Sequence, residues 1–152
     1  MDVVLVRHGT AEGSARRDRE RALTLEGRRE SRELGERLSR EGFAPELVIA
    51  SPFVRAVQTA ELVAAALGQV GPMRVSRALR PDCDAGGVVE LLAALDGIER
   101  VMLVAHEPVL SSTCAALSGN GGVGFRRAEA VWLAWQPPLP GNARIRWRGT
   151  GP

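Results

Sequence analysis

Two short apolar runs, each followed at once by a histidine, constrain this chain more than any other feature of its sequence. The runs cover residues 3–6 and 101–105, and their valine-rich composition predicts two buried strands. Arg7 and His8 follow the first run, His106 follows the second, and these are the two histidines of the chain. Ligands of open α/β sheets bind just beyond the carboxyl ends of the strands. The sequence therefore predicts that both histidines and Arg7 meet at one anion-binding site.

The remaining chain alternates between segments typical of strands and segments typical of helices. This alternation predicts an α/β fold with a mainly parallel sheet and helices on both faces. Thr24 is expected to cap one helix, and Ser51 to cap the next with Pro52 at its first position. No repeat or linker is evident, so residues 1–152 are expected to form a single domain. Further strands are predicted at 47–50, 73–76, 131–135 and 143–147, the last two as a hairpin or as edge strands, and helices at 24–42, 51–68, 88–95 and 109–117.

Composition excludes several classes of protein. Apolar residues make up 45% of the chain and charged residues 25%, as in globular domains. No apolar run approaches the roughly 20 residues of a membrane span, and the start of the chain does not resemble a signal peptide, so we expect neither membrane insertion nor export. Cys83 and Cys114 are too few for a disulfide framework and lack metal-ligand spacing, which favours a reducing cytoplasm.

All 20 basic residues are arginines, while the formal net charge is only +2. The absence of lysine indicates genome composition more than a function that requires arginine. The densest basic stretch, residues 16–32, is interleaved with acidic residues and is interpreted as a solvated, ion-paired face. A nucleic-acid-binding protein would show a one-signed patch with aromatic residues for stacking. Aromatic residues are only 4% of this chain, so binding to nucleic acid is not expected.

Four side chains have the chemistry of phosphoryl transfer. His8 can act as a nucleophile through one ring nitrogen if a backbone carbonyl or similar acceptor holds the proton on the other. Arg7 and Arg55 can bind phosphate oxygens in a forked geometry, and Arg55 is expected in the first turn of a helix, close to strand ends. His106, if protonated, adds positive charge. Such a cluster can catalyse the reaction without a metal or cofactor.

Each of these residues also has an ordinary structural interpretation. A histidine at a strand end is often structural, His106 could cap the helix that follows it, and Arg55 could be a surface residue. Their order and their strand-end positions together favour one phosphate pocket. Three further residues are candidates for substrate binding, each with an alternative: Thr10 could instead serve a turn, Ser51 a helix cap, and Glu107 the N-terminal dipole of a helix.

Four segments resemble the successive signatures of the histidine phosphatase (phosphoglycerate mutase-like) superfamily. The resemblance spans residues 2 to about 118, and the compact length and the His-Glu-Pro form are similar to SixA-type phosphohistidine phosphatases. It implies a three-layer α/β/α sandwich, His8 as the phosphorylated nucleophile, and Arg7, Arg55 and His106 as the rest of the pocket. The segments are Leu5-Val6-Arg7-His8-Gly9, Leu23-Thr24-Leu25-Glu26-Gly27, residues 51–60 beginning Ser51-Pro52-Phe53, and Leu103-Val104-Ala105-His106-Glu107-Pro108.

The substrate is harder to predict. Larger superfamily members carry an insertion that covers the pocket and supplies an acidic proton donor, whereas residues 79–86 occupy that region here with no lid. Asp82 or Asp84 could donate a proton, although loop aspartates commonly serve turns or helix caps. An open site and a weak acid favour phosphohistidine on a signalling or phosphorelay protein. A phosphatase for small sugar or nucleotide phosphates and a non-catalytic phosphoprotein-binding module stay open as alternatives, as do the oligomeric state and any role of the cysteines.

Overall fold

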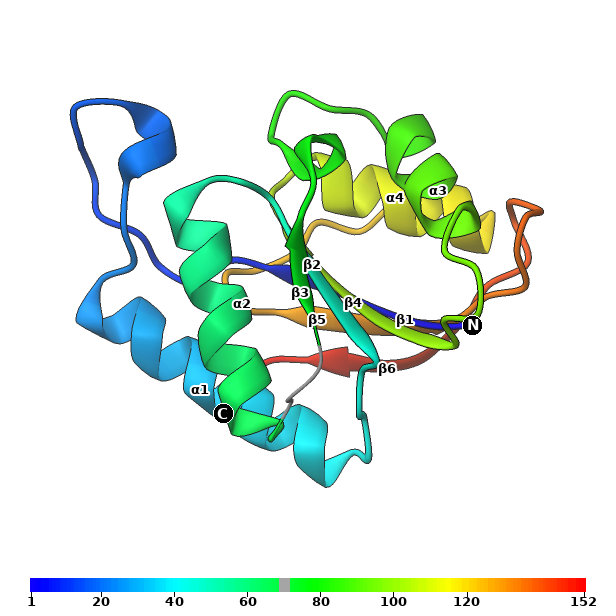
Figure 1. Cartoon of the computed structure of the whole chain (residues 1–152), viewed down its shortest axis with the longest axis horizontal. Helices are drawn as coiled ribbons and strands as arrows, with labels where there is room; N and C mark the ends of the chain where they lie inside the picture. Colours follow the sequence, from blue (N-terminus) through cyan, green and yellow to red (C-terminus); the bar gives the residue numbers. More distant parts are fainter. Residues whose placement is uncertain (69–71) are drawn as a thin grey trace.

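The two apolar runs form neighbouring strands at the centre of one sheet. The computed structural model describes residues 1–68 and 72–152. The strands of this part of the chain lie in the order β3-β2-β4-β1-β5-β6, as Figure 1 shows. Their bounds are β1 (Asp2–Arg7), β2 (Leu47–Ala50), β3 (Met73–Val75), β4 (Arg100–Ala105), β5 (Ala130–Ala134) and β6 (Arg144–Gly149).

Strands β3, β2, β4 and β1 are parallel, and β5 and β6 complete the sheet in antiparallel pairs. The predicted mainly parallel sheet is therefore confirmed, and so is the hairpin at the end of the chain. In the pairing of β1 with β4, Arg7 lies opposite Ala105. This register brings the two histidines, each one residue further on, to the same edge of the sheet.

Helices cover both faces of the sheet, which confirms the three-layer arrangement. Figure 1 shows α1 and α2 on one face and α3 and α4 on the other. Short 3-10 turns, η1 and η2, interrupt two of the loops. The bounds are η1 (Asp18–Glu20), α1 (Leu25–Arg40), α2 (Val54–Ala66), η2 (Arg77–Leu79), α3 (Ala85–Ala93) and α4 (Val109–Ser118).

Alternate residues of the central strands build two hydrophobic cores. In β1, Val3 and Leu5 face the core beneath α3 and α4, while Val4 and Val6 face the core beneath α1 and α2. All four side chains are fully buried, and each contributes about 1.5–3 kcal/mol by leaving water. A slip of one residue would exchange the two faces of the strand, so the packing fixes the register and with it the position of His8.

Two helix starts agree with the predictions, at Thr24 and Val109, and two differ. Thr24 caps α1 as expected, its hydroxyl accepting a hydrogen bond from the Gly27 N–H at 3.0 Å. The prediction that Ser51 caps α2 was wrong: Phe53 is the N-cap residue and the helix begins at Val54, because the Ser51 hydroxyl bonds elsewhere. Helix α3 begins at Ala85, three residues earlier than predicted, and Asp84 caps it.

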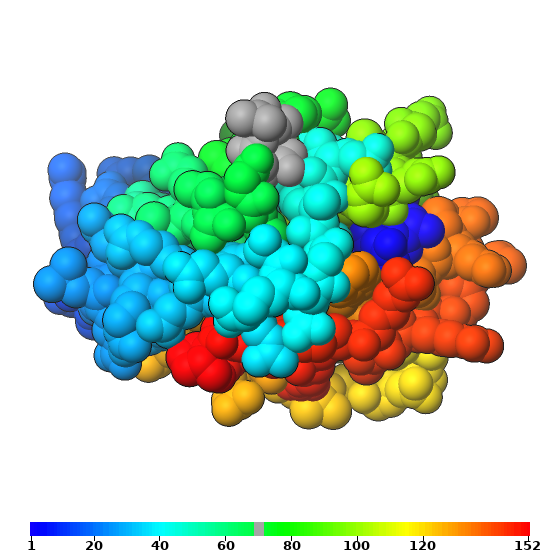
Figure 2. Space-filling view, turned by 90° about the horizontal axis from the view of Figure 1, so that it is seen from below, coloured from blue at the N-terminus to red at the C-terminus, as the bar shows by residue number. Residues whose placement is uncertain are grey.

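The C-terminal residues lie against α1, as the neighbouring red and blue-cyan regions of Figure 2 show. A Cβ atom on Gly151 would come within 2.4 Å of the Glu33 carbonyl carbon and 2.6 Å of the Leu34 nitrogen, so the close approach requires glycine there. Both ends of the chain are thus attached to the same sheet-and-helix framework. In the part of the chain that the structure describes, no helix is both long and apolar enough to cross a membrane.

Candidate active site

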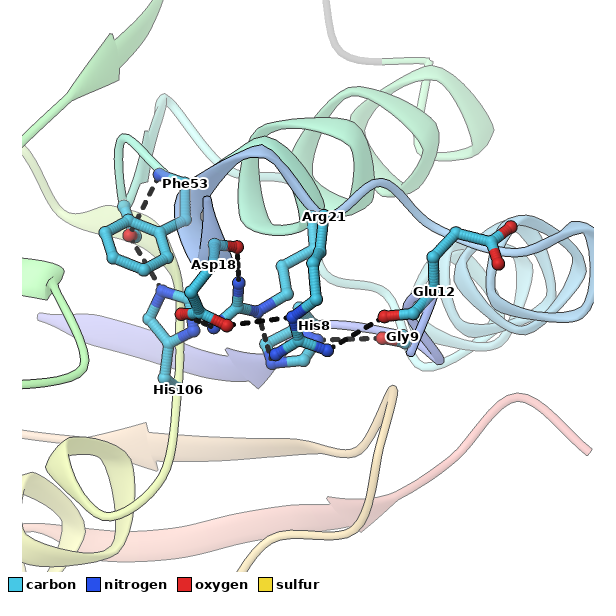
Figure 3. Close-up of polar contacts among 9 residues, drawn as sticks. His8, Gly9, Glu12, Asp18, Arg21, Phe53 and His106 are labelled. Atoms are coloured by element: carbon cyan, nitrogen blue, oxygen red, sulfur yellow. Dashed lines mark hydrogen bonds and ion pairs between the residues drawn. The ribbon is translucent and has the colours of Figure 1, made fainter. Parts of the chain in front are cut away.

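The loops at the carboxyl ends of β1, β2 and β4 surround a cavity of about 210 Å³. The ring centroids of His8 and His106 are 5.1 Å apart, so the two histidines meet as the strand pattern predicts. Figure 3 shows the two rings next to each other, with Asp18 and Arg21 close by. The lining residues are Arg7, His8, Ala11, Arg21, Arg55, Pro81, His106, Glu107 and Arg127.

His8 is held with one ring nitrogen available for chemistry. Its Nδ1 lies 2.8 Å from the Gly9 carbonyl oxygen, which can only accept a hydrogen bond, so Nδ1 carries the proton. Its Nε2 then has a free lone pair, and the Arg55 Nε–H donates to it at 3.3 Å. Burial lowers the pKa of His8 to about 4, although the hydrogen bond to Gly9 acts in the opposite direction. The positive charges of Arg55, Arg7 and Arg21 lower this pKa further. The ring is neutral at pH 7, as a nucleophile requires.

Ser51 sets the orientation of the second histidine. The Ser51 Oγ lies 2.8 Å from His106 Nε2 and accepts a hydrogen bond from the Phe53 N–H at 3.3 Å. If the Ser51 hydroxyl donates to His106 Nε2, the ring proton lies on Nδ1, a buried nitrogen without a partner within the described structure. Burial, followed by the charges of neighbouring groups, lowers the pKa of His106 to about 3. His106 would add positive charge only if it were protonated, and in this structure its ring is neutral at pH 7.

Arg55 is anchored by Asp18, which lies in the basic stretch predicted to be a solvated face. Its side chain is buried, with Nη1 donating to the Asp18 carbonyl oxygen at 2.9 Å and Nη2 to the Asp18 carboxylate at 3.3 Å. Arg21 donates to the other oxygen of the same carboxylate at 2.8 Å. These contacts hold the pKa of Asp18 below its usual range, with the Arg21 hydrogen bond as the largest cause.

Asp18 and Arg21 are site residues that the sequence analysis missed. They lie in the basic stretch 16–32, whose alternating charges are typical of a solvated surface. The available signal was their position in the loop directly after β1, because loops at the carboxyl ends of strands build the sites of α/β sheets. Arg127, which also lines the cavity, had no such signal in the sequence.

Arg7 and Glu107 are connected through the backbone of one residue. The Arg7 Nη1 donates to the Phe125 carbonyl oxygen at 2.7 Å, and the Phe125 N–H donates to Glu107 Oε2 at 3.2 Å. The other oxygen of Glu107 accepts from the Ser111 N–H, near the start of α4, at 2.9 Å. Glu107 therefore interacts with a helix start, as its alternative interpretation proposed, and it also holds the residue that contacts Arg7.

Three other candidates do not line the cavity. Thr10 donates its hydroxyl proton to Glu30 at 2.6 Å, so a role for Thr10 in substrate binding is not supported by this geometry. Asp84 accepts from the Gly87 N–H at 3.1 Å as a helix cap, and Asp82 lies 3.4 Å from Arg80 on the surface. Neither aspartate lines the cavity. Both cysteines are unbridged.

Known proteins with the same signatures share the fold and, in one group, much of the sequence. The family model of the histidine phosphatase superfamily (branch 1) matches residues 3–86. Phosphohistidine phosphatase SixA of Escherichia coli (strain K12) is 36% identical over 119 residues, which are 77% of this chain and 74% of that protein. A structure of the protein histidine phosphatase SixA complexed with tungstate has a TM-score of 0.93 and 31% identity, covering 99% of this chain and 97% of that one.

The fold alone is shared more widely. A mycobacterial glucosyl-3-phosphoglycerate phosphatase in complex with VO3 has a TM-score of 0.70 at 22% identity, covering 96% of this chain and 97% of that one. The family match, by contrast, includes the strand-end arginine and histidine and the segment that carries Arg55. With the second histidine in contact range of the first, sequence and geometry agree that this chain is a phosphatase that belongs to the histidine phosphatase superfamily.

Proposed function

We propose that the protein removes the phosphoryl group from phosphohistidine on a signalling or phosphorelay protein, through a phosphorylated His8. The observation that carries this proposal is the His8 ring itself, neutral, with its proton on Nδ1 and its Nε2 lone pair beside Arg55. The similarity to SixA, a phosphohistidine phosphatase, supports the choice of substrate. The reaction takes place in two in-line steps.

In the first step, His8 Nε2 attacks the phosphorus, and the bond between phosphorus and the substrate's imidazole nitrogen breaks. The electron pair of that bond stays on the substrate ring, which leaves as neutral imidazole once its other nitrogen has taken up a proton from solvent. Arg7, Arg55 and the His106 Nδ1–H bind the phosphoryl oxygens and stabilise their charge. These groups supply the positive charge and the hydrogen bonds that the transfer needs, so the proposal includes no metal ion.

In the second step, water attacks the phosphorus of phosphorylated His8. The bond from phosphorus to Nε2 breaks, its electron pair returns to Nε2, and the products are neutral His8 and dihydrogen phosphate. The Gly9 carbonyl keeps the proton on Nδ1 throughout. His8 therefore leaves as neutral imidazole, in the same way as the substrate ring in the first step.

The proton requirement favours phosphohistidine over alkyl phosphates. An alkyl ester would expel a strongly basic alkoxide unless a positioned acid protonated it, and such help is worth about 10² to 10⁴ in rate. Asp84 caps a helix, and Asp82 pairs with Arg80 on the surface, so neither of these possible proton donors lies at the cavity. A phosphohistidine ring that is protonated by solvent has less need of a general acid than an alkyl ester, and it therefore suits this site.

The test compares substrates and traps the intermediate. The wild type is expected to dephosphorylate a phosphohistidine-containing phosphotransfer protein faster than a panel of sugar and nucleotide phosphates, and to form an acid-labile phosphoenzyme. His8→Asn is the informative variant, because its amide can still donate to the Gly9 carbonyl but offers no Nε2 nucleophile. Full activity of His8→Asn would refute the mechanism. Faster hydrolysis of the small esters would identify a small-molecule phosphatase, and binding without any phosphoenzyme would identify a non-catalytic module.

A further inference from the structure

The loop before β5 is hydrogen-bonded to the end of β1 at two points. We call residues 124–129 the strap. The Arg7 N–H donates to the Glu129 carbonyl oxygen at 3.0 Å, and the Ala128 N–H donates to the His8 carbonyl oxygen at 3.1 Å. The strap thus contacts the backbone of the two residues that begin the candidate active site.

The strap also holds the side chain of Arg7. The Phe125 carbonyl oxygen accepts from Arg7 Nη1 at 2.7 Å. The Arg7 Nε is buried and has no partner within the structure, so this carbonyl is the contact that fixes the guanidinium. Any displacement of the strap would move the Arg7 guanidinium relative to the His8 ring.

An ion pair with a buried carboxylate holds the strap in turn. Glu129 is 3% exposed, and its carboxylate accepts two hydrogen bonds from Arg148 of β6, from Nε and Nη2, each 3.0 Å long. The same carboxylate accepts from the Arg126 N–H at 2.7 Å, and Arg148 also donates to the Gly124 carbonyl oxygen at 2.6 Å. Such forked pairing fixes both position and orientation. Arg148 therefore connects both ends of the strap to the last strand of the sheet.

The backbone of the strap adopts a conformation that needs outside support. Ala128 is buried and has a φ of +50°, the one positive φ at a non-glycine residue in the described chain. Left-handed backbone is unfavourable for alanine and persists where the surrounding contacts determine it. Burial opposes ionisation of Glu129, but hydrogen bonds from Arg148 and the Arg126 N–H outweigh it and lower the pKa of Glu129, so the support stays charged at neutral pH.

We propose that Glu129 and Arg148 are positioning residues for Arg7, their ion pair fixing the strap so that the Phe125 carbonyl holds the Arg7 guanidinium at the cavity. The inference rests on the proposed function in one respect, that Arg7 binds the phosphoryl group. It assigns a part in the reaction to the C-terminal strand, which contributes no residue to the lining of the cavity.

The test measures binding of inorganic phosphate by calorimetry, together with the urea stability of the same variants. Arg148→Ala is expected to weaken phosphate binding on the order of 10-fold, since a displaced Arg7 guanidinium loses charge-assisted hydrogen bonds to the phosphate oxygens. Arg148→Lys keeps the positive charge but cannot make the paired hydrogen bonds to the Glu129 carboxylate, and it should recover part of the phosphate affinity. Arg146→Ala is the matched control: it removes an exposed arginine of the same strand that pairs with Asp2 at 3.1 Å, and should leave phosphate binding unchanged.

A double-substitution cycle separates positioning from general destabilisation. In an Arg7→Ala background, Arg148→Ala should cause no further loss of phosphate affinity, although it should still lower stability. Equal losses with and without Arg7, or unchanged affinity in Arg148→Ala, would overturn the inference. If Arg148→Ala does not fold, Glu129→Gln provides the same comparison with a nearly isosteric side chain. Should Arg7→Ala itself bind phosphate normally, the assignment of Arg7 in the proposed function fails as well, and the two failures are thus distinguishable.

Discussion

The two buried histidines should make the stability of this protein strongly dependent on pH. They are the two histidines of the sequence, and burial lowers the pKa of His8 to about 4 and that of His106 to about 3. In the unfolded chain both titrate near the ordinary value of 6.5. Below that pH the unfolded state binds protons that the folded state does not, so stability is complete above about pH 6.5 and falls as the pH falls toward the folded pKa values.

The size of the effect follows from these values. At about pH 5 an unfolded histidine is almost fully protonated, while the folded His8 and His106 are almost fully neutral. Each histidine then contributes a loss of about 1.5 pH units times 1.36 kcal/mol, or about 2 kcal/mol. Together they should lower the free energy of unfolding by about 4 kcal/mol between about pH 8 and about pH 5. This is a large part of the roughly 5–15 kcal/mol that stabilises an ordinary domain.

The assay is urea unfolding at a series of pH values between about 8 and 5, above the range in which most carboxylates titrate. The wild type is compared with His8→Asn and with His8→Asn combined with His106→Gln, whose side chain can still accept from the Ser51 hydroxyl. The single variant should lose half of the pH dependence and the double variant nearly all of it. A flat wild-type profile, or the same slope in the double variant, would show that neither ring resists protonation in the folded state.

Two further substitutions test the contacts around the site. Ser51→Ala leaves the buried Nε2 of His106 without its hydrogen-bond partner, so we expect a loss of about 1–3 kcal/mol in the free energy of unfolding and a lower kcat on the phosphohistidine substrate; an unchanged kcat would contradict the role given to the hydroxyl. Gly27→Ala places a Cβ atom 2.0 Å from the Thr10 carbonyl oxygen and should destabilise the protein by about 1–3 kcal/mol in urea unfolding, whereas the control Gly13→Ala, with no atom within 4 Å of the new methyl group, should not.

The central sheet and the main pocket residues were predictable because their signals are local and periodic. The apolar runs of β1 and β4 specify buried strands, and the parallel topology then places His8 and His106 at one edge. Arg55 could be placed because it lies in the first turn of its helix as predicted, although that helix starts two residues later than expected. In these cases a short segment and one general packing rule were enough.

Two of the misplaced features depend on contacts between distant segments, and the third depends on a local helix cap. Ser51 has the sequence of a helix cap, but its hydroxyl is oriented by His106. Thr10 lies two residues after His8, yet its hydroxyl donates to Glu30 of α1 and does not line the cavity. The start of α3 was predicted too late because Gly86 and Gly87 have low helix propensity, which the Asp84 cap offsets. Helix propensity and residue spacing carry no information about distant partners such as His106 for Ser51 or Glu30 for Thr10.

The insertion of β4 between β1 and β2 has a consequence for the nascent chain. During synthesis, the segment with His8, Arg7 and Arg55 emerges well before the segment that contains His106 and the strand beside it. Until that strand arrives, β1 and β2 have no common neighbour in the sheet, and the site lacks His106. The complete site therefore forms only after β4 has paired with β1 and β2. A chain that ends before β4 carries Arg7, His8 and Arg55 but lacks His106.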